Sequence, residues 1–408
     1  MNNLQIIKDE KFKGIYLSIN FLLPIIKSEI SNNVIWASTI TKKSAKYITE
    51  REIDLIFSDL YDSSYGARVE ILGDLYNIEF RMECLNSTFL PSKENVFKKA
   101  LEVFLEIIYN PYVENNALDP KIVARQKALI EDKLKERKEN KKVYAVSKLE
   151  EILDQGEPSS SYLYGDKENL DKVTPESAYK QYLKVLKDAN VEVVLAGNVE
   201  DYMIDLIKDN VKFNSYKYDN VMQNNIKEKL SETIEKADSS QSVLVLGGKI
   251  KKYNVEDSYK YFVYNSILGQ NPSSKLFQEV REKASLSYYI NSIFRRFKGE
   301  LVIYTGINSE NYESAKKIIF KQINEMKNGN ITENEFATAK KYLIAEFYDY
   351  CNSTESIARY YFYNKLCYGK TVSIQNMIEN IKNISLQEVI DVAKNVEIQQ
   401  MYLLKGGN

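Results

Sequence analysis

The chain contains no histidine among its 408 residues. Imidazole is the usual general base near neutral pH and the commonest metal ligand in proteins. Its absence excludes Ser-His-Asp triads, Cys-His dyads and every zinc motif that is built on paired histidines. A hydrolytic function that depends on such a site would need residues from another chain.

Cysteine is also scarce, and neither sign of charge is in excess. The three cysteines, Cys84, Cys351 and Cys367, are odd in number and widely spaced, which argues against a disulfide framework and favours a reducing cytoplasm. Lys and Arg total 56 against 57 Asp and Glu, so the formal net charge is −1. Such a balance provides no overall field to attract nucleic acid or an acidic membrane. We therefore expect a cytoplasmic location and no nucleic-acid partner.

Long apolar runs are absent as well. No run approaches the roughly 18 apolar residues of a membrane-spanning helix, and the first residues lack the apolar core and cleavage site of a secretion signal. No membrane is therefore expected among the partners. The hydrophobic content of 44% is nevertheless ample for a core. The length suggests two to three domains or one duplicated unit.

The predicted elements occur twice in the same order. Each half contains a strand, two helices, a hairpin, further helices and a closing strand, and the hairpins are predicted at Gly73-Asp74 and Lys298-Gly299. Residues 213–240 have little apolar periodicity and are expected to be the linker. We therefore predict an α+β fold with two homologous domains, 1–220 and 235–408, each a mainly antiparallel sheet flanked by helices. Chance similarity of two α+β domains is the alternative to duplication.

Three polar stretches have structural interpretations. Gly247-Gly248-Lys249 lacks the spacing of a phosphate-binding loop and is expected to be a turn at the end of a strand. Arg295-Arg296 is expected to be a solvated strand end rather than a nucleic-acid contact. Residues 119–156 are predicted to form one long helix with a charged, solvated face.

The most specific stretch is 264–289, YNSILGQNPSSKLFQEVREKASLSYY. Gly269 is predicted to end one helix, and Ser273 or Ser274 to begin the next. Ser285 is expected to end that second helix before a strand begins. This order places Arg281 in a last helical turn and Tyr288 at the start of the strand.

These residues resemble the pattern LGGxxSSRLFxxVREKxGLAY in the second half of the insulinase-like (pitrilysin, inverzincin) zinc peptidases and the mitochondrial processing peptidases. Weaker likeness around Tyr47 and Thr49, and from Tyr164 to Thr174, extends the resemblance over essentially the whole chain. The resemblance implies that the two domains form half of a clamshell.

The resemblance also places the family's zinc site. Its H-x-x-E-H motif falls on Val34, Ala37 and Ser38, and its distal glutamate ligand falls on Ala124. These residues supply neither the imidazole and carboxylate ligands nor the base that catalytic zinc requires. We therefore expect no metal, no cofactor and no activity from this chain alone, with zinc only in a partner subunit. A carboxylate-only metal site is a third interpretation, but no compact Asp/Glu cluster lies at these positions.

The resemblance gives Arg281 and Tyr288 a role in substrate binding. In the family, an arginine and a tyrosine at this spacing bind the substrate backbone and help to stabilise the oxyanion. Two structural alternatives stay open. Arg281 would favour a helix C-terminus or pair with an acid, and Tyr288, one of 31 tyrosines, would pack in the core.

Two functions of different classes follow. The first is a non-catalytic subunit of a peptide-processing heterodimer, in which an active insulinase-like partner carries H-x-x-E-H and this chain supplies Arg281 and Tyr288. The resemblance is to small bacterial members that occur as an inactive and active pair. The second is a peptide-binding or scaffold homodimer with no role in proteolysis.

Overall fold

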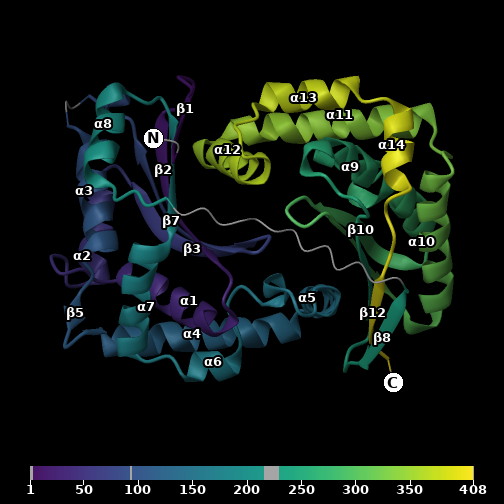
Figure 1. Cartoon of the computed structure of the whole chain (residues 1–408), viewed down its shortest axis with the longest axis horizontal. Helices are drawn as coiled ribbons and strands as arrows, with labels where there is room; N and C mark the ends of the chain where they lie inside the picture. Colours follow the sequence, from purple (N-terminus) through teal and green to yellow (C-terminus); the bar gives the residue numbers. More distant parts are fainter. Residues whose placement is uncertain (1–2, 92–93, 216–228, 408) are drawn as a thin grey trace. The chain divides into compact units, whose positions relative to one another are not determined.

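The computed structural model describes residues 3–91, 94–215 and 229–407 (Figure 1). Within these ranges no helix combines the length and apolar character needed to cross a membrane. The chain divides into two compact units. The first comprises Met1–Lys135, Ser161–Val221 and Cys351–Tyr363, and the second comprises Glu136–Ser160, Met222–Tyr350 and Asn364–Asn408. The units follow the predicted halves apart from two exchanged segments, 136–160 and 351–363.

The first unit contains a five-stranded sheet in the order β1-β7-β2-β4-β3. Its strands are β1 (Leu4–Lys8), β2 (Gly14–Pro24), β3 (Ser64–Leu72), β4 (Leu75–Leu85) and β7 (Asn190–Gly197). Only β1 and β7 pair in parallel, and every other neighbouring pair in this sheet is antiparallel. Two short strands, β5 (Val113–Glu114) and β6 (Ala117–Leu118), form a separate antiparallel pair.

The second unit repeats this sheet. Its strands are β8 (Ser231–Lys236), β9 (Ser242–Lys249), β10 (Ser287–Arg295), β11 (Glu300–Ile307) and β12 (Gln400–Lys405), in the order β10-β11-β9-β12-β8. Only β8 and β12 are parallel in this sheet. Each strand thus has a counterpart in the first sheet, and the two predicted hairpins, β3–β4 and β10–β11, occupy the same edge. The α+β class with mainly antiparallel sheets is confirmed, and the shared order supports duplication.

Helices of the first unit pack on an apolar face of its sheet. They are α1 (Ile30–Ile40), α2 (Glu50–Asp59), α3 (Val96–Tyr109), α4 (Pro120–Glu139), α6 (Lys167–Asp171), α7 (Pro175–Asp188) and α8 (Asp201–Asn210). Alternation along β4 directs Ile78, Phe80 and Met82 into the core, where Phe80 stacks on Trp36 of α1 at 5.8 Å between ring centroids. Thr174 caps α7 through a capping box with Ser177, and Pro175 suits the first helical position because its fixed φ is already helical.

The second unit includes one helix, α5 (Lys141–Leu153), from the first half of the sequence. Its other helices are α9 (Ser258–Asn265), α10 (Tyr312–Lys327), α11 (Glu333–Asp349), α13 (Ile374–Asn383) and α14 (Leu386–Ala393), with π-helical turns at Ser266–Gln270 and Phe277–Lys283. Helix α12 (Thr354–Tyr368) starts after a break in the helical region near Asn352. Residues of α12 reach the first sheet through ion pairs of 2.6 Å, Glu355 with Arg68 and Arg359 with Glu70.

The predicted helix 119–156 is wrong, because the chain forms two helices there. Helix α4 ends at Glu139, and Asn140 begins α5 by accepting a hydrogen bond from the Val143 amide. Helix α5 then packs Ala145 and Leu149 on the second sheet, against residues of β9, β11 and β12. The break is not evident from the sequence, because the charged residues on both sides of it look uniformly helical. The apolar residues on which α5 packs lie about a hundred residues or more further along the chain.

Three other predictions also need correction. The predicted linker 213–240 includes β8, an edge strand whose side chains are mostly exposed, and residues 216–228 lie outside the described residues. Gly247, Gly248 and Lys249 lie within β9 rather than in a turn. A Cβ on Gly247 would come 2.5 Å from Leu149 Cδ2 of α5, so the close approach of the helix requires glycine there. Arg295 is paired with Glu150 of α5 instead of being solvated.

Buried charges join the end of α5 to the second sheet. Lys249 of β9 is 1% exposed and forms ion pairs with Glu157 and, at 3.3 Å, with Asp154. Lys298 in the hairpin turn pairs with the same Asp154 and lies 3.4 Å from Glu300 of β11. Burial, and secondarily the neighbouring Asp154 carboxylate, raise the pKa of Glu300 to about 8. Glu300 is therefore mostly protonated at neutral pH.

Candidate functional site

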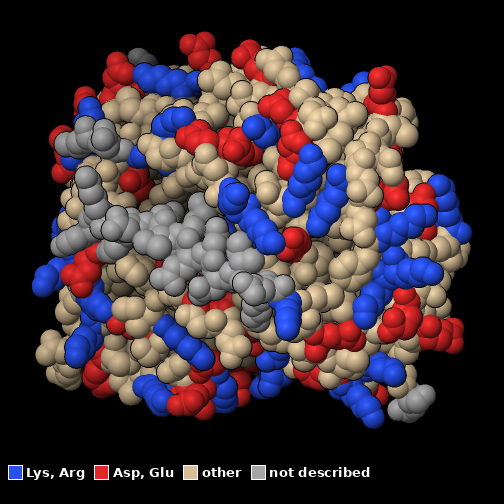
Figure 2. All heavy atoms as spheres, turned by 45° about the vertical axis from the view of Figure 1, so that its right-hand side comes forward, with Lys and Arg blue, Asp and Glu red and all other residues tan. Residues whose placement is uncertain are grey.

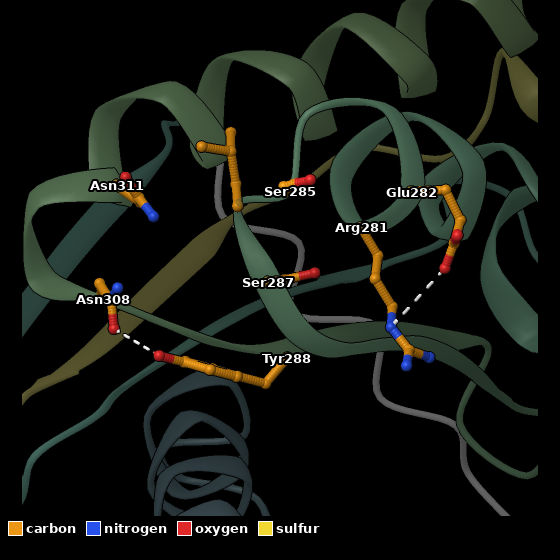
Figure 3. Close-up of a pocket in the computed structure, with 8 residues that line it drawn as sticks. Arg281, Glu282, Ser285, Ser287, Tyr288, Asn308 and Asn311 are labelled. Atoms are coloured by element: carbon orange, nitrogen blue, oxygen red, sulfur yellow. Dashed lines mark hydrogen bonds and ion pairs between the residues drawn. The ribbon is translucent and has the colours of Figure 1, made fainter.

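A pocket of about 360 Å³ in the second unit contains both residues that the sequence singles out (Figure 3). Its lining residues come from the second π-helical segment, the turn after it, the start of β10 and the loop after β11. They are Arg281, Glu282, Ser285, Leu286, Ser287, Tyr288, Asn308 and Asn311. The fold therefore brings Arg281 and Tyr288 to one site, although they lie on different elements.

A sharp helix end produces this arrangement. The Ser285 amide donates to the Arg281 carbonyl at 3.1 Å, and the Leu286 amide donates to the Val280 carbonyl at 3.0 Å. Ser285 has a φ of 52°, the left-handed conformation that commonly ends helices. The chain reverses there and enters β10, so the last helical turn and the first strand residues face the same pocket.

Arg281 is held only loosely. Its side chain is 42% exposed, and its Nε lies 3.9 Å from Glu282 Oε1, beyond hydrogen-bonding distance. The guanidinium carbon lies 4.6 Å from the centroid of the Phe277 ring, which supports the side chain from one face. Among the described residues, no hydrogen-bond acceptor engages its two terminal nitrogens. Its donors are therefore available to a ligand.

Tyr288 lies at the surface and not in the core. Its side chain is 52% exposed, and its hydroxyl donates to Asn308 Oδ1 at 2.8 Å. Figure 3 shows the ring directed at Asn308, away from the Arg281 guanidinium. The two side chains thus occupy opposite sides of the pocket.

Sequence reasoning missed the asparagines and serines of the pocket. Asn308 precedes a single turn of helix, Ser309–Asn311, between β11 and α10, and Asn311 ends it; asparagine at such positions ordinarily signals only a turn. Ser287 Oγ is buried and, among the described residues, has no hydrogen-bond partner. No local pattern marks these residues, because the pairing of β10 with β11 is what brings them to the pocket.

The positions that match the zinc motif do not fit a metal. Val34 and Ala37 are 4% and 2% exposed in the apolar core around α1. The Ser38 hydroxyl donates to the Val34 carbonyl at 2.8 Å, within its own helix, and Ala124 is an exposed residue of α4. None of these side chains offers a zinc ligand.

No alternative metal or thiol site stands out in the described part of the chain. There, no group of three or more His, Cys, Asp or Glu side chains is arranged to hold a metal ion. Burial raises the pKa of Cys84 to about 12 and that of Cys367 to about 11. Both thiols are therefore protonated near neutral pH and are weak nucleophiles.

Comparison with known sequences identifies relatives along the chain. A family model described as "Peptidase M16 inactive domain" matches residues 172–343. The chain is 25% identical over 405 residues to the probable inactive metalloprotease YmfF of Bacillus subtilis (strain 168), covering 98% of this chain and 95% of that protein. It is also 27% identical over 227 residues to the uncharacterized zinc protease YmxG of the same organism, covering 54% of each.

Solved structures share the fold. A conserved protein from Enterococcus faecalis V583 superimposes with a TM-score of 0.91 at 24% identity, covering 99% of this chain and 96% of that one. A peptidase M16 inactive domain from Pseudomonas fluorescens superimposes with a TM-score of 0.79 at 18% identity and with the same coverage of both chains. The chain is therefore similar in sequence and in fold to M16-type peptidases, and it carries none of the histidines of the H-x-x-E-H zinc motif.

Proposed function

We propose that the chain is a non-catalytic subunit of an M16-type peptidase heterodimer in the cytoplasm. In this assembly a zinc-binding partner performs hydrolysis, and this chain contributes Arg281 and Tyr288 to peptide binding. One observation carries the proposal: both side chains line the same open pocket, where the terminal nitrogens of Arg281 have no acceptor among the described residues, while apolar or small residues fill the positions of the zinc motif.

The relatives support a subunit role. The chain is similar over nearly its whole length to a protein named a probable inactive metalloprotease, and over about a third to a half of it to several proteins named uncharacterized zinc proteases. A chain of complex III2 from Candida albicans has the same fold, with a TM-score of 0.74 at 14% identity, so this fold occurs within a larger complex. Charges of both signs are interspersed over the face in Figure 2, which gives no support to a nucleic-acid partner.

Kinetics of the assembled complex test the proposal. The chain is co-expressed with an M16 homologue from the same genome that carries H-x-x-E-H, and peptide hydrolysis is measured. Tyr288→Phe should lower kcat by about 10²-fold if the hydroxyl leaves Asn308 and donates to the oxyanion. Arg281→Ala should mainly raise KM, because a set of substrate-binding donors is lost.

Tyr348→Phe is the matched control, since Tyr348 is 50% exposed and lies outside the pocket. Unchanged kinetics in both pocket variants, with the control also unchanged, would reject the proposed role of this pair.

A peptide-binding scaffold homodimer is the second candidate, and the position of β10 favours it. This strand has a neighbour on one side only within the described sheet, so an extended peptide could pair with its other side. The isolated chain should in either case bind no stoichiometric zinc and cleave no peptide, which metal analysis and a fluorogenic assay would measure. A stable homodimer that gives no activity with any zinc-binding homologue would favour the scaffold.

A further inference from the structure

We infer that the pocket of Arg281 and Tyr288 binds the C-terminal carboxylate of a peptide. This inference rests on the proposed peptide-binding function and specifies the part of the peptide that is recognised. It follows from the excess of hydrogen-bond donors in the pocket, from its single cation and from its place beside an edge strand.

The free polar groups of the pocket are mostly donors. The two terminal nitrogens of Arg281 carry four N–H donors, and neither nitrogen can accept a hydrogen bond. The Asn308 side chain already accepts from Tyr288, so its amide N–H groups remain to be shared with a ligand. The buried Ser287 hydroxyl adds a further donor that has no partner among the described residues. A ligand that satisfies this set must present several acceptor oxygens.

The charge of the pocket favours a monoanion. Arg281 is the only cation among the lining residues, and Glu282 lies on its Nε side at 3.9 Å. The edge formed by the two terminal nitrogens is left open, and two parallel N–H donors there match the two oxygens of a carboxylate. Glu282 would repel a phosphate dianion more strongly than a carboxylate, because the repulsion grows with the charge of the ligand.

The position of the pocket favours the terminal carboxylate of a peptide over a side-chain carboxylate. Ser287 and Tyr288 begin β10, whose outer edge has no strand neighbour in the described sheet. A peptide that pairs antiparallel with this edge runs toward the start of β10, so a peptide that ends there places its own terminal carboxylate beside Arg281. A side-chain carboxylate would instead point out of the plane of the strands. The volume of about 360 Å³, with Leu286 in its wall, suits one terminal residue.

The test uses the isolated full-length chain and three pools of fluorescein-labelled random hexapeptides. The first two pools lack Asp and Glu and end in a free carboxylate or in an amide. The third is amidated and has Glu at its last position. Fluorescence anisotropy should show at least about tenfold tighter binding of the free-acid pool than of either amidated pool, as expected for one charge-assisted pair of hydrogen bonds.

Three variants locate the effect. Arg281→Gln should abolish the preference for the free acid, and Glu282→Gln should strengthen it by removing the competing carboxylate. Lys283→Gln removes a nearby positive charge outside the pocket, where Lys283 pairs with Glu279, and should leave the preference intact. If Arg281 had only a structural role, Arg281→Gln and Glu282→Gln would not change the preference for the free acid in opposite directions.

Failure of this inference is distinguishable from failure of the proposed function. If the acid and amide pools bind equally well, and Arg281→Gln abolishes binding of both, carboxylate recognition is overturned while peptide binding stays in place. A preference for the Glu-ended amide pool would overturn recognition of the chain end. Absence of binding to every pool would also overturn the inference, and the kinetics of the Tyr288→Phe complex would then decide the proposed function separately.

Discussion

Ser285 shows how one residue shapes the site. Its φ of 52° is a conformation that costs an L-residue roughly 1–2 kcal/mol and glycine almost nothing. Ser285→Gly should therefore raise the free energy of unfolding by about 0.5–1 kcal/mol, after the greater entropy of glycine in the unfolded chain is subtracted. Urea denaturation would measure the change.

Ser285→Ala is the matched control, because it removes the same hydroxyl and keeps the strained conformation. Its stability should equal that of the parent or fall slightly below it. If alanine and glycine stabilise the protein equally, the hydroxyl rather than the backbone is the cause and the argument from φ is wrong.

At the residue scale, the sequence predicted part of the candidate site. Arg281 and Tyr288 were found because their neighbours form a contiguous motif, and both line the pocket. Asn308, Asn311 and Ser287 could not be found, since their proximity depends on strand pairing between β10 and β11. Lys249 was missed for a related reason: its partners, Asp154 and Glu157, lie about ninety residues earlier in the chain.

The packing of α5 on β9 makes a prediction at the scale of elements. A Cβ on Gly247 would come 2.5 Å from Leu149 Cδ2, so Gly247→Ala should displace the helix and cost about 1–3 kcal/mol. Leu149→Ala alone should cost about 2–5 kcal/mol through the cavity that it leaves. The double variant should lose less than the sum, because each change relieves the other. Additive losses in guanidinium denaturation would show that the two residues do not meet.

The charges at the end of α5 make a prediction about pH. The folded protein holds a proton on Glu300 up to a pKa of about 8, whereas the ordinary value is 4.5. Folding therefore takes up a proton between these values, so the contribution of Glu300 is fully present below about pH 4.5 and is lost as pH rises to about 8. Asp154, Lys298, Arg295 and Lys249 carry the charges around this carboxyl.

Glu300→Gln removes this titration. Relative to the variant, the parent should lose stability progressively between about pH 4.5 and 8 and should change little above that range. Denaturation midpoints at pH 5, 7 and 9 would measure the difference, and Glu310→Gln, at an exposed position, controls for loss of a carboxylate. Parallel profiles for the parent and Glu300→Gln would contradict the proposed protonation.

Most elements were predictable because their signals are local. Both hairpins, the capped helix α7 and the break before α12 follow from turn residues, caps and periodicity. The break at Asn140 and strand β8 were not predictable, since each depends on a distant partner. Helix α5 gains its stability from the second sheet, and β8 from pairing with β12.

The two exchanged segments, 136–160 and 351–363, affect the folding of the whole molecule. A chain beginning at residue 222 lacks 136–160, which would leave the apolar residues of β9, β11 and β12 without the cover of α5. This fragment should expose hydrophobic surface, bind the dye ANS and unfold without a sharp transition. Addition of a synthetic peptide of residues 136–160 should restore cooperative unfolding. A fragment that unfolds cooperatively without the peptide, at the same Tm as the intact protein, would contradict this dependence.

The second exchange has a consequence for synthesis on the ribosome. Residues 1–135 belong to a unit that also includes 351–363, so that unit remains incomplete until more than two hundred further residues have been translated. At ~5–20 residues per second the delay is roughly 10–40 seconds. During this time the polar face of the first sheet, including Arg68 and Glu70, awaits its partners on α12. The surface that waits longest, the one that α12 covers, is thus charged rather than apolar, which lowers its tendency to cause aggregation before release.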